Sequence, residues 1–304
     1  MVKQKGILWI IGVIALLLLF GYVLATAIAV FLGRGIPTGG NIALIPIHGV
    51  ILSTGASSPF GDAVASSTKI VEFIKQADKN PSVKAIIFDI NSPGGSGVAS
   101  DEIATAIRKT NKTTVSFIRE VGASGAYWVA SSTDYVLVNK LSYTGSIGVL
   151  ASYLEFSGLL TDYNVTYQRL VAGKYKDIGT PWKKLTDEER NLIQEQLGDA
   201  HEIFIEEVAE NRGLSVEVVR RLATGQPIMG YRAKELGLVD SIGGKDEAIR
   251  FVEEMYNITA DVAEYKQKVT LLDMLASVFS QGFYRMGLGI GYGLKQEQPM
   301  YVWT

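Results

Sequence analysis

The chain has 304 residues, of which 47% are hydrophobic and 20% are charged, a composition typical of a globular protein and not of a disordered or fibrous one. The formal net charge is −2 and no basic run is longer than two residues, which excludes a nucleic-acid-binding protein. Cysteine is absent, which excludes disulfides and thiolate metal sites and fits an oxidising compartment outside the cytoplasm.

An uncharged apolar run occupies residues 7–32. A helix needs about 20 such residues to cross about 30 Å of hydrocarbon, so we expect a transmembrane anchor that contacts membrane lipid. A cleavable signal peptide, cut near Ala25, is the alternative, but its apolar core usually spans about 7 to 15 residues. Lys3 and Lys5 favour a cytoplasmic location for residues 1–6. The remainder is then the extracytoplasmic part of a single-pass protein of the cell membrane.

After a linker at residues 33–40, apolar runs alternate with helical patterns. Nearly continuous hydrophobicity is typical of strands that are covered on both faces. Strands are predicted at residues 42–51, 83–90, 114–118, 135–138 and 165–171. Helical spacing is found at 70–77 and 98–109, so the order strand, helix, strand predicts an α/β fold with a mainly parallel sheet.

Beyond the fifth predicted strand the pattern becomes helical. Thr186 and Glu189 form a capping box, and the apolar face that follows continues until Gly213. A shorter helix is expected at 215–223. An apolar stripe at 271–286 predicts a further helix, packed on a neighbouring subunit, on the membrane or in the core.

Three segments rich in small residues are candidates for chemistry. NSPGGSG (91–97) follows a predicted strand, so its glycine N–H groups can hold an oxyanion or phosphate, or it can form a type II turn. In GASGAYW (122–128), Ser124 opens a predicted helix and is either a nucleophile beside an oxyanion donor or a helix cap. TGSIGV (144–149) sets Ser146 between glycines.

Few residues can serve as the base for a serine nucleophile. The chain has two histidines, His48 and His201, and both occupy positions typical of structural or surface residues. No helix carries the paired histidines of a metalloprotease, and no metal is expected. A lysine is therefore the expected base, and AGKYKDIG (172–179) offers Lys174 and Lys176.

Taken together and in this order, NSPGGSG, GASGAYW, TGSIGV, GKYKD and GLVDSIGG resemble the signal peptide peptidase A family of serine proteases, in its short, single-unit form. The resemblance implies the Clp protease/crotonase-like fold, with repeated β-β-α or β-α-β units around a mainly parallel sheet. It also implies a catalytic domain over residues 41–260. It gives no guidance for residues 261–304, where the sequence pattern itself predicts a helix and a flexible tail. Finally, it implies a homo-oligomer that degrades cleaved signal peptides and other apolar peptides.

The same resemblance implies a role for each candidate, without any cofactor. The implied roles are Ser124 as nucleophile, Lys176 as general base, Ser146 as the residue that orients the lysine, and Gly94, Gly95 and Gly125 as the oxyanion hole. An ordinary lysine has a pKa of about 10.4, so a neutral amine at pH 7 costs about 4.6 kcal/mol, which desolvation can supply. We therefore expect Lys176 to be buried among apolar side chains, within hydrogen-bond reach of Ser124 and Ser146.

Three other functions compete with this one. A related membrane-bound protease acting on a specific membrane-protein partner is the first, although the carboxyl-terminal region lacks several further apolar spans. A crotonase-type enzyme acting on acyl-CoA is the second, but it gives no reason for the anchor or for a serine and lysine pair. A peptide-binding protein without activity is the third.

Overall fold

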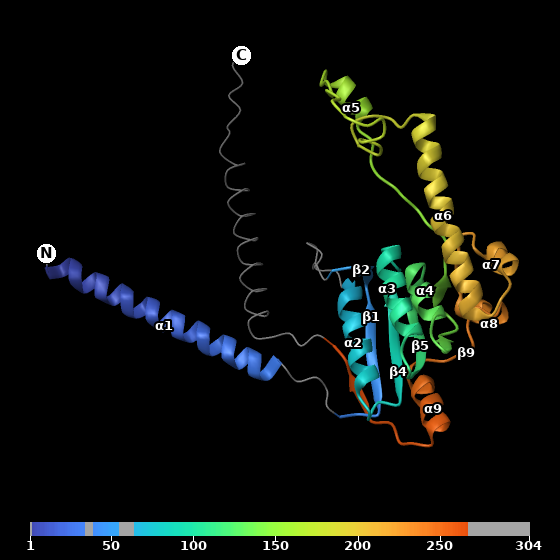
Figure 1. Ribbon diagram of the computed structural model, residues 1–304, viewed down its shortest axis with the longest axis horizontal. Helices are drawn as coiled ribbons and strands as arrows, with labels where there is room; N and C mark the ends of the chain where they lie inside the picture. The colour runs from blue at the N-terminus through green and yellow to red at the C-terminus, as the bar shows by residue number, and fades with distance from the viewer. Residues whose placement is uncertain (1, 34–38, 55–63, 267–304) are drawn as a thin grey trace, which may run out of the picture. The chain divides into compact units, whose positions relative to one another are not determined.

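The computed structural model describes residues 2–33, 39–54 and 64–266, and within the first helix it describes the side chains of residues 9 and 12–26. The chain divides into two units (Figure 1). One unit is continuous, from Gly39 to Tyr265, and the other comprises the two ends of the chain.

In the terminal unit, α1 (Val2–Gly33) is helical over the whole predicted run at 7–32. Across the part of the chain that the structure describes, no helix has the length and apolarity needed to cross a membrane. The helix predicted at 271–286 and the tail after it lie outside the described residues.

The continuous unit is built on an eight-stranded, mainly parallel sheet with the order β10-β1-β4-β5-β6-β9, from which β7 pairs with β5 and β8. Its strands are β1 (Ile42–His48), β4 (Ala85–Ser92), β5 (Thr113–Ala123), β6 (Tyr135–Val138), β7 (Tyr143–Gly145), β8 (Pro227–Met229), β9 (Ser241–Ile242) and β10 (Val262–Glu264). A separate parallel pair is formed by β2 (Val50–Leu52) and β3 (Val64–Ser66). The predicted α/β class is confirmed, and the sheet fits a Clp protease/crotonase-like fold.

Helices cover both faces of this sheet. They are α2 (Ser67–Lys79), α3 (Gly97–Arg108), α4 (Gly125–Ser131), α5 (Ser157–Asp162), α6 (Asp187–Arg212), α7 (Val216–Leu222), α8 (Gly230–Glu235) and α9 (Lys245–Tyr256). Phe88 of β4 belongs to the core cluster that includes α2, α3, α4 and α6, whereas its neighbour Ile87 packs on the opposite face with Val252 of α9. This alternation explains the continuous hydrophobicity of the central strands, because every residue meets a helix layer.

Most predicted elements are found where the sequence placed them, including the capping box of Thr186 and Glu189 at the start of α6. The run at 42–51 is divided into β1 and β2, because Gly49 adopts a positive φ of 80° between them. The strand predicted at 165–171 is wrong. That segment pairs with no strand among the described residues, and a strand without a partner leaves its backbone hydrogen bonds unmade.

The segment 165–171 belongs instead to a projection over residues 150–185, which we call the arm. The arm carries the short helix α5, which lies away from the sheet (Figure 1). Its apolar side chains are largely exposed, with Leu170 93% and Leu150 81% accessible. The sequence of this segment is apolar, but no helix layer or sheet of the unit covers its side chains.

The core contribution of β4 can be measured with Phe88→Ala. Phe88 is fully buried, so truncation should lower the free energy of unfolding by about 3–5 kcal/mol through lost burial and a cavity. Val98→Ala on α3 is the matched control, because Val98 is 67% exposed and its truncation should change stability by less than about 0.5 kcal/mol. Urea titration of both variants makes the comparison, and equal losses would contradict the layer arrangement.

Candidate active site

Ser124 lies at the junction where β5 ends and α4 begins, in a backbone conformation that serine rarely adopts. Its φ is 54° and its ψ is −128°. Such a conformation costs about 1–3 kcal/mol and persists only where the surroundings fix it. The Ser124 N–H donates to the carbonyl of Gly145 (2.8 Å), and the Ser124 carbonyl accepts from the N–H of Tyr127 (2.8 Å). The strained turn is therefore held from both sides.

The hydroxyl of Ser124 makes no capping hydrogen bond to α4. The helix instead closes on the Ser124 carbonyl, which also accepts from the N–H of Trp128 (3.0 Å). The interpretation of the Ser124 side chain as a helix cap therefore fails, and the hydroxyl of this half-buried residue is left for another partner.

The glycine turn after β4 packs directly on the backbone of this junction. A Cβ added to Gly94, which has a φ of 94°, would lie 2.7 Å from the nitrogen of Gly125 and 2.8 Å from the carbonyl oxygen of Ala123. On its other side the turn is bonded to β2, because the Ile51 N–H donates to the Gly94 carbonyl (2.9 Å). No larger residue fits in this space.

Two backbone N–H groups of this turn and junction adjoin each other without a carbonyl partner. Gly125 is the first residue of α4, where an amide has no intrahelical acceptor, and among the described residues no backbone carbonyl accepts from Gly95. A Cβ added to Gly125 would lie 3.5 Å from the Gly95 nitrogen, so the two amides are neighbours. By contrast, the Gly94 N–H already donates to the hydroxyl of Ser92 (3.1 Å). Paired free amides of this kind suit a developing oxyanion.

Ser146 lies beside Ser124 because the strands that precede them are paired. In the parallel register of β5 and β7, Ala123 is opposite Gly145, and each serine follows its paired residue. Ser146 also has a positive φ, of 51°. Its hydroxyl donates to the carbonyl of Gly225 (2.8 Å).

Within a single copy of the chain, Lys176 does not lie with Ser124 and Ser146. It lies in the arm, its side chain is exposed, and among the described residues no hydrogen bond or ion pair links it to Ser124 or Ser146. The expectation of a lysine buried among apolar side chains is therefore wrong for one copy of the chain. The physical reason is that the chain leaves the sheet soon after Ser146, and the arm projects away from the helix layers.

Helix α4 is fixed by a tyrosine that the sequence did not single out. The hydroxyl of Tyr127 donates to the Leu238 carbonyl (2.8 Å), and the residue is fully buried. Burial raises the pKa of Tyr127 well above its ordinary value, because the charged phenolate would be desolvated. Two residues of NSPGGSG were likewise missed as supports, Ser92 for Gly94 and Asn91, whose side-chain oxygen accepts from Val121 (3.2 Å).

The histidines occupy structural positions. His48 Nε2 lies 3.1 Å from a carboxylate oxygen of the buried residue Asp89, and His201 Nε2 lies 3.3 Å from the carbonyl of Ile147. Within the described part of the chain, neither histidine forms a hydrogen bond or ion pair with Ser124. Among those same residues, no cluster of His, Cys, Asp and Glu could hold a metal ion.

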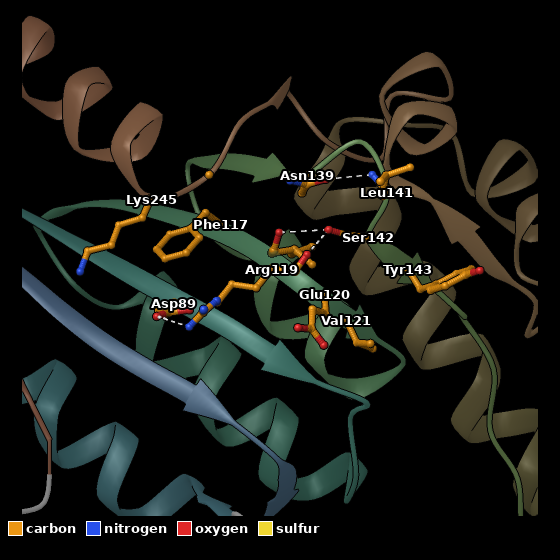
Figure 2. A pocket seen from close by; sticks show the side chains of 12 residues that line it. Asp89, Phe117, Arg119, Glu120, Val121, Asn139, Leu141, Ser142, Tyr143 and Lys245 are labelled. Carbon is orange, nitrogen blue, oxygen red and sulfur yellow. Dashed lines mark hydrogen bonds and ion pairs between the residues drawn. The ribbon is translucent and has the colours of Figure 1, made fainter.

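A separate cleft of about 830 Å³ lies at the ends of the central strands (Figure 2). Asp89 and Arg119 approach each other within it (3.7 Å), beside Phe117 and near Lys245 of α9. No residue predicted for the site lines this cleft. This cleft is thus distinct from the Ser124 turn.

Comparison with known proteins adds to this geometry. The profile of peptidase family S49 matches residues 106–259. A protein of Methanocaldococcus jannaschii that bears the name of a protease is 33% identical over 227 residues, which cover 74% of this chain and 71% of that protein. One of Enterococcus faecium that bears the name signal peptide peptidase SppA is 33% identical over 234 residues, 76% of this chain and 68% of its own. Protease 4 of Salmonella typhi is 32% identical over 245 residues, 78% of this chain and 38% of its own.

The close packing of the glycine turn predicts that alanine substitutions at Gly94 and Gly97 have different effects on stability. Gly94→Ala should lower the free energy of unfolding by about 1–3 kcal/mol, because the methyl group meets backbone atoms and the positive φ is unfavourable. Gly97→Ala in the first turn of α3 meets nothing within 4 Å and should be neutral or slightly stabilising. Urea titration measures both, and a neutral Gly94→Ala would contradict the packing described here.

Proposed function

The chain belongs to peptidase family S49 as a protease of the SppA type, and from that premise we propose that it is a serine endopeptidase with a Ser124/Lys176 dyad. The observation that carries the proposal is the Ser124 junction. There, an uncapped hydroxyl on a strained turn lies next to the free N–H group of Gly125 in the same junction, and the free N–H group of Gly95 adjoins it from the glycine turn. A nucleophile and a place for the oxyanion are thus provided together.

In the proposed reaction the neutral amine of Lys176 takes the hydroxyl proton as Ser124 Oγ attacks the carbonyl carbon of a peptide bond. The carbonyl oxygen becomes negative and is bound by the N–H groups of Gly95 and Gly125, at about 2.7–4 kcal/mol for each donor. The resulting ammonium then protonates the leaving amine as the C–N bond breaks. Water hydrolyses the acyl ester and restores the serine. The Gly94 amide, already bonded to Ser92, serves to shape the turn.

Ser146 is proposed to orient the lysine. A hydroxyl has one proton and two acceptor lone pairs. Since the Ser146 proton is directed to the Gly225 carbonyl, its oxygen faces other donors as an acceptor. An N–H of the lysine side chain is a suitable donor, and accepting it would direct the nitrogen lone pair to Ser124.

Assembly of several copies is proposed to complete the dyad. Lys176 is exposed on the arm, and the arm also exposes many apolar side chains. Monomeric soluble proteins rarely expose so many apolar side chains in one region. The exposed apolar side chains of the arm include Leu150, Leu154, Tyr163, Val165, Leu170 and Trp182. A second copy that covers this surface would supply the desolvation that a neutral lysine needs, and would carry the arm to a neighbouring Ser124.

The proposed substrates are remnants of cleaved signal peptides and other apolar peptides at the membrane. A relative's name, signal peptide peptidase SppA, supports this substrate class. The small residues around Ser124 allow close approach of an extended peptide backbone. The uncharged run at residues 7–32 supports a single-pass anchor, with the continuous unit on the extracytoplasmic side of the cell membrane.

Fluorophosphonate labelling tests the dyad. The full chain should be labelled and should cleave an apolar peptide, while Ser124→Ala should lose both completely and Lys176→Ala should lose at least about 100-fold in labelling rate, as expected for a general base. Ser132→Ala, a helix-capping serine in the same region, is the control and should match the wild type. Label retained by Ser124→Ala would end the proposal.

Mixing the two inactive variants tests whether the dyad forms between copies. Ser124→Ala supplies Lys176 and Lys176→Ala supplies Ser124, so mixed oligomers should regain part of the activity if the lysine reaches a neighbouring copy. Each variant alone, at the same total concentration, is the control. Mixtures that stay inactive although size-exclusion chromatography shows mixed assembly would contradict the arrangement between copies.

Membrane attachment is tested by extraction of cell membranes with alkaline carbonate. The full chain should stay in the pellet, whereas a Leu17→Asp/Leu18→Asp variant should move largely to the wash, because each carboxylate costs about 2.5–3.5 kcal/mol at the centre of a span. Protease added outside intact cells should reach the continuous unit. A wild-type chain recovered in the wash would refute the anchor.

A further inference from the structure

We propose that the ion pairs surrounding residues 173–180, the base turn, keep its neighbouring carboxylates away from Lys176 and so leave its amine free to lose a proton. This inference rests on the proposed function, in which Lys176 is the general base. It assigns a purpose to Arg169, Lys174 and Lys183, three cations for which the family motif gives no role.

The base turn is closed by its own backbone. The Lys176 N–H donates to the Gly173 carbonyl (3.2 Å), and the Ile178 N–H donates to the Tyr175 carbonyl (3.1 Å). Gly173 has a positive φ of 100°, which allows the chain to reverse there. Lys176 is therefore presented from a compact loop and not from a free strand.

Asp177 follows Lys176 directly and is the nearest carboxylate to it along the chain. It is instead held by Arg169, whose Nε and Nη2 donate to the two carboxylate oxygens at 2.7 and 2.9 Å. The same guanidinium donates to the Lys174 carbonyl (3.0 Å), which ties it to the turn. Hydrogen bonding to Arg169 lowers the pKa of Asp177, so this carboxylate stays ionised and engaged.

The first turn of α6 brings two more carboxylates to the base turn, and each also has another cation. Glu188 accepts both hydrogen bonds of Lys174 (2.7 and 2.6 Å) and one from the Tyr175 hydroxyl. Glu189 pairs with Lys183, which also lies 3.8 Å from Asp177. The hydrogen bond from Lys174 is the main cause of a lowered pKa for Glu188, as that from Lys183 is for Glu189.

All three carboxylates around the base turn are thus matched by cations other than Lys176. Among the described residues Lys176 itself forms no ion pair, although residues on both sides of it do. A carboxylate within about 4–6 Å favours the charged form of an amine. A general base needs the neutral form, so a carboxylate released onto Lys176 would oppose catalysis without touching the substrate.

The alternative is that these pairs only stabilise the arm. Exposed ion pairs contribute about 0–1 kcal/mol to stability, and Lys174 and Glu188 are 67% and 53% exposed. A purely structural role predicts lower activity at every pH by the same factor. The proposed role predicts a change in the pH at which activity appears, which separates the two.

The test is the pH dependence of kcat/KM for peptide cleavage by the full chain carrying Lys174→Gln, Glu188→Gln or both changes. Lys174→Gln releases Glu188, so the rise of activity should move to higher pH, by about half a pH unit for such an exposed pair. The double variant has no Glu188 carboxylate to release, so its kcat/KM should rise at the same pH as that of the wild type. Lys75→Gln on α2 is the matched surface control and should leave the profile in place.

A second cycle uses the more enclosed pair, with Arg169→Gln and Arg169→Gln/Asp177→Asn. The single variant should show the larger displacement to high pH, because the Asp177 side chain is 10% exposed and adjoins Lys176 in sequence. Arg169→Lys, which keeps the charge, should recover most of the wild-type profile. If the first variant of this cycle does not fold, the Lys174 cycle decides the question.

Unmoved profiles in Lys174→Gln and Arg169→Gln, or double variants as displaced as the singles, would overturn the inference. Failure of the proposed function is a different result, because Lys176→Ala would then cleave peptide at the wild-type rate. With Lys176→Ala inactive and the profiles unmoved, the dyad stands and the ion pairs are structural.

Discussion

The site depends on one strained backbone conformation, that of Ser124 at φ 54°. The strain is maintained because β7 accepts the Ser124 N–H through Gly145, because α4 closes on the Ser124 carbonyl, and because Gly94 fills the space beneath. The parallel pairing of β5 with β7 therefore orders Ser124 and Ser146 together, and the clamp between β2 and the glycine turn fixes the amide of Gly95.

Lys176, the proposed base, belongs to a different part of the unit and obeys different constraints. Ser124 and the amides are held by the buried sheet and its helices, whereas Lys176 is carried by an arm that has no layer to cover it. A second copy of the chain that covers the arm would bury its exposed apolar side chains. The same cover would provide the desolvation that the proposed lysine base needs. In the proposed dyad, an isolated copy therefore presents Ser124 without Lys176 beside it.

On the arm, ion pairs flank the amine of Lys176, which itself has no counter-ion among the described residues. Arg169 with Asp177 and Lys174 with Glu188 form these pairs on both sides of Lys176. These pairs add little to stability in the open, but they decide which cation each carboxylate neutralises. In the proposed mechanism Lys174 holds a carboxylate and Lys176 is kept free of one, although the two lysines are two residues apart.

The sequence by itself determined the α/β class, the central strands, the caps of α6 and the family motifs, because periodicity, capping residues and glycine spacing are local properties. The family resemblance implied that Ser124 and the glycine turn lie together, and the parallel pairing of β4 with β5, which precede them, accounts for it. Only the tertiary structure decided that residues 165–171 form no strand, that the Ser124 hydroxyl is no cap, and that Lys176 is exposed. The physical reason is that pairing and burial depend on what lies opposite a segment, and an apolar run looks the same whether a helix layer, a second copy or nothing covers it.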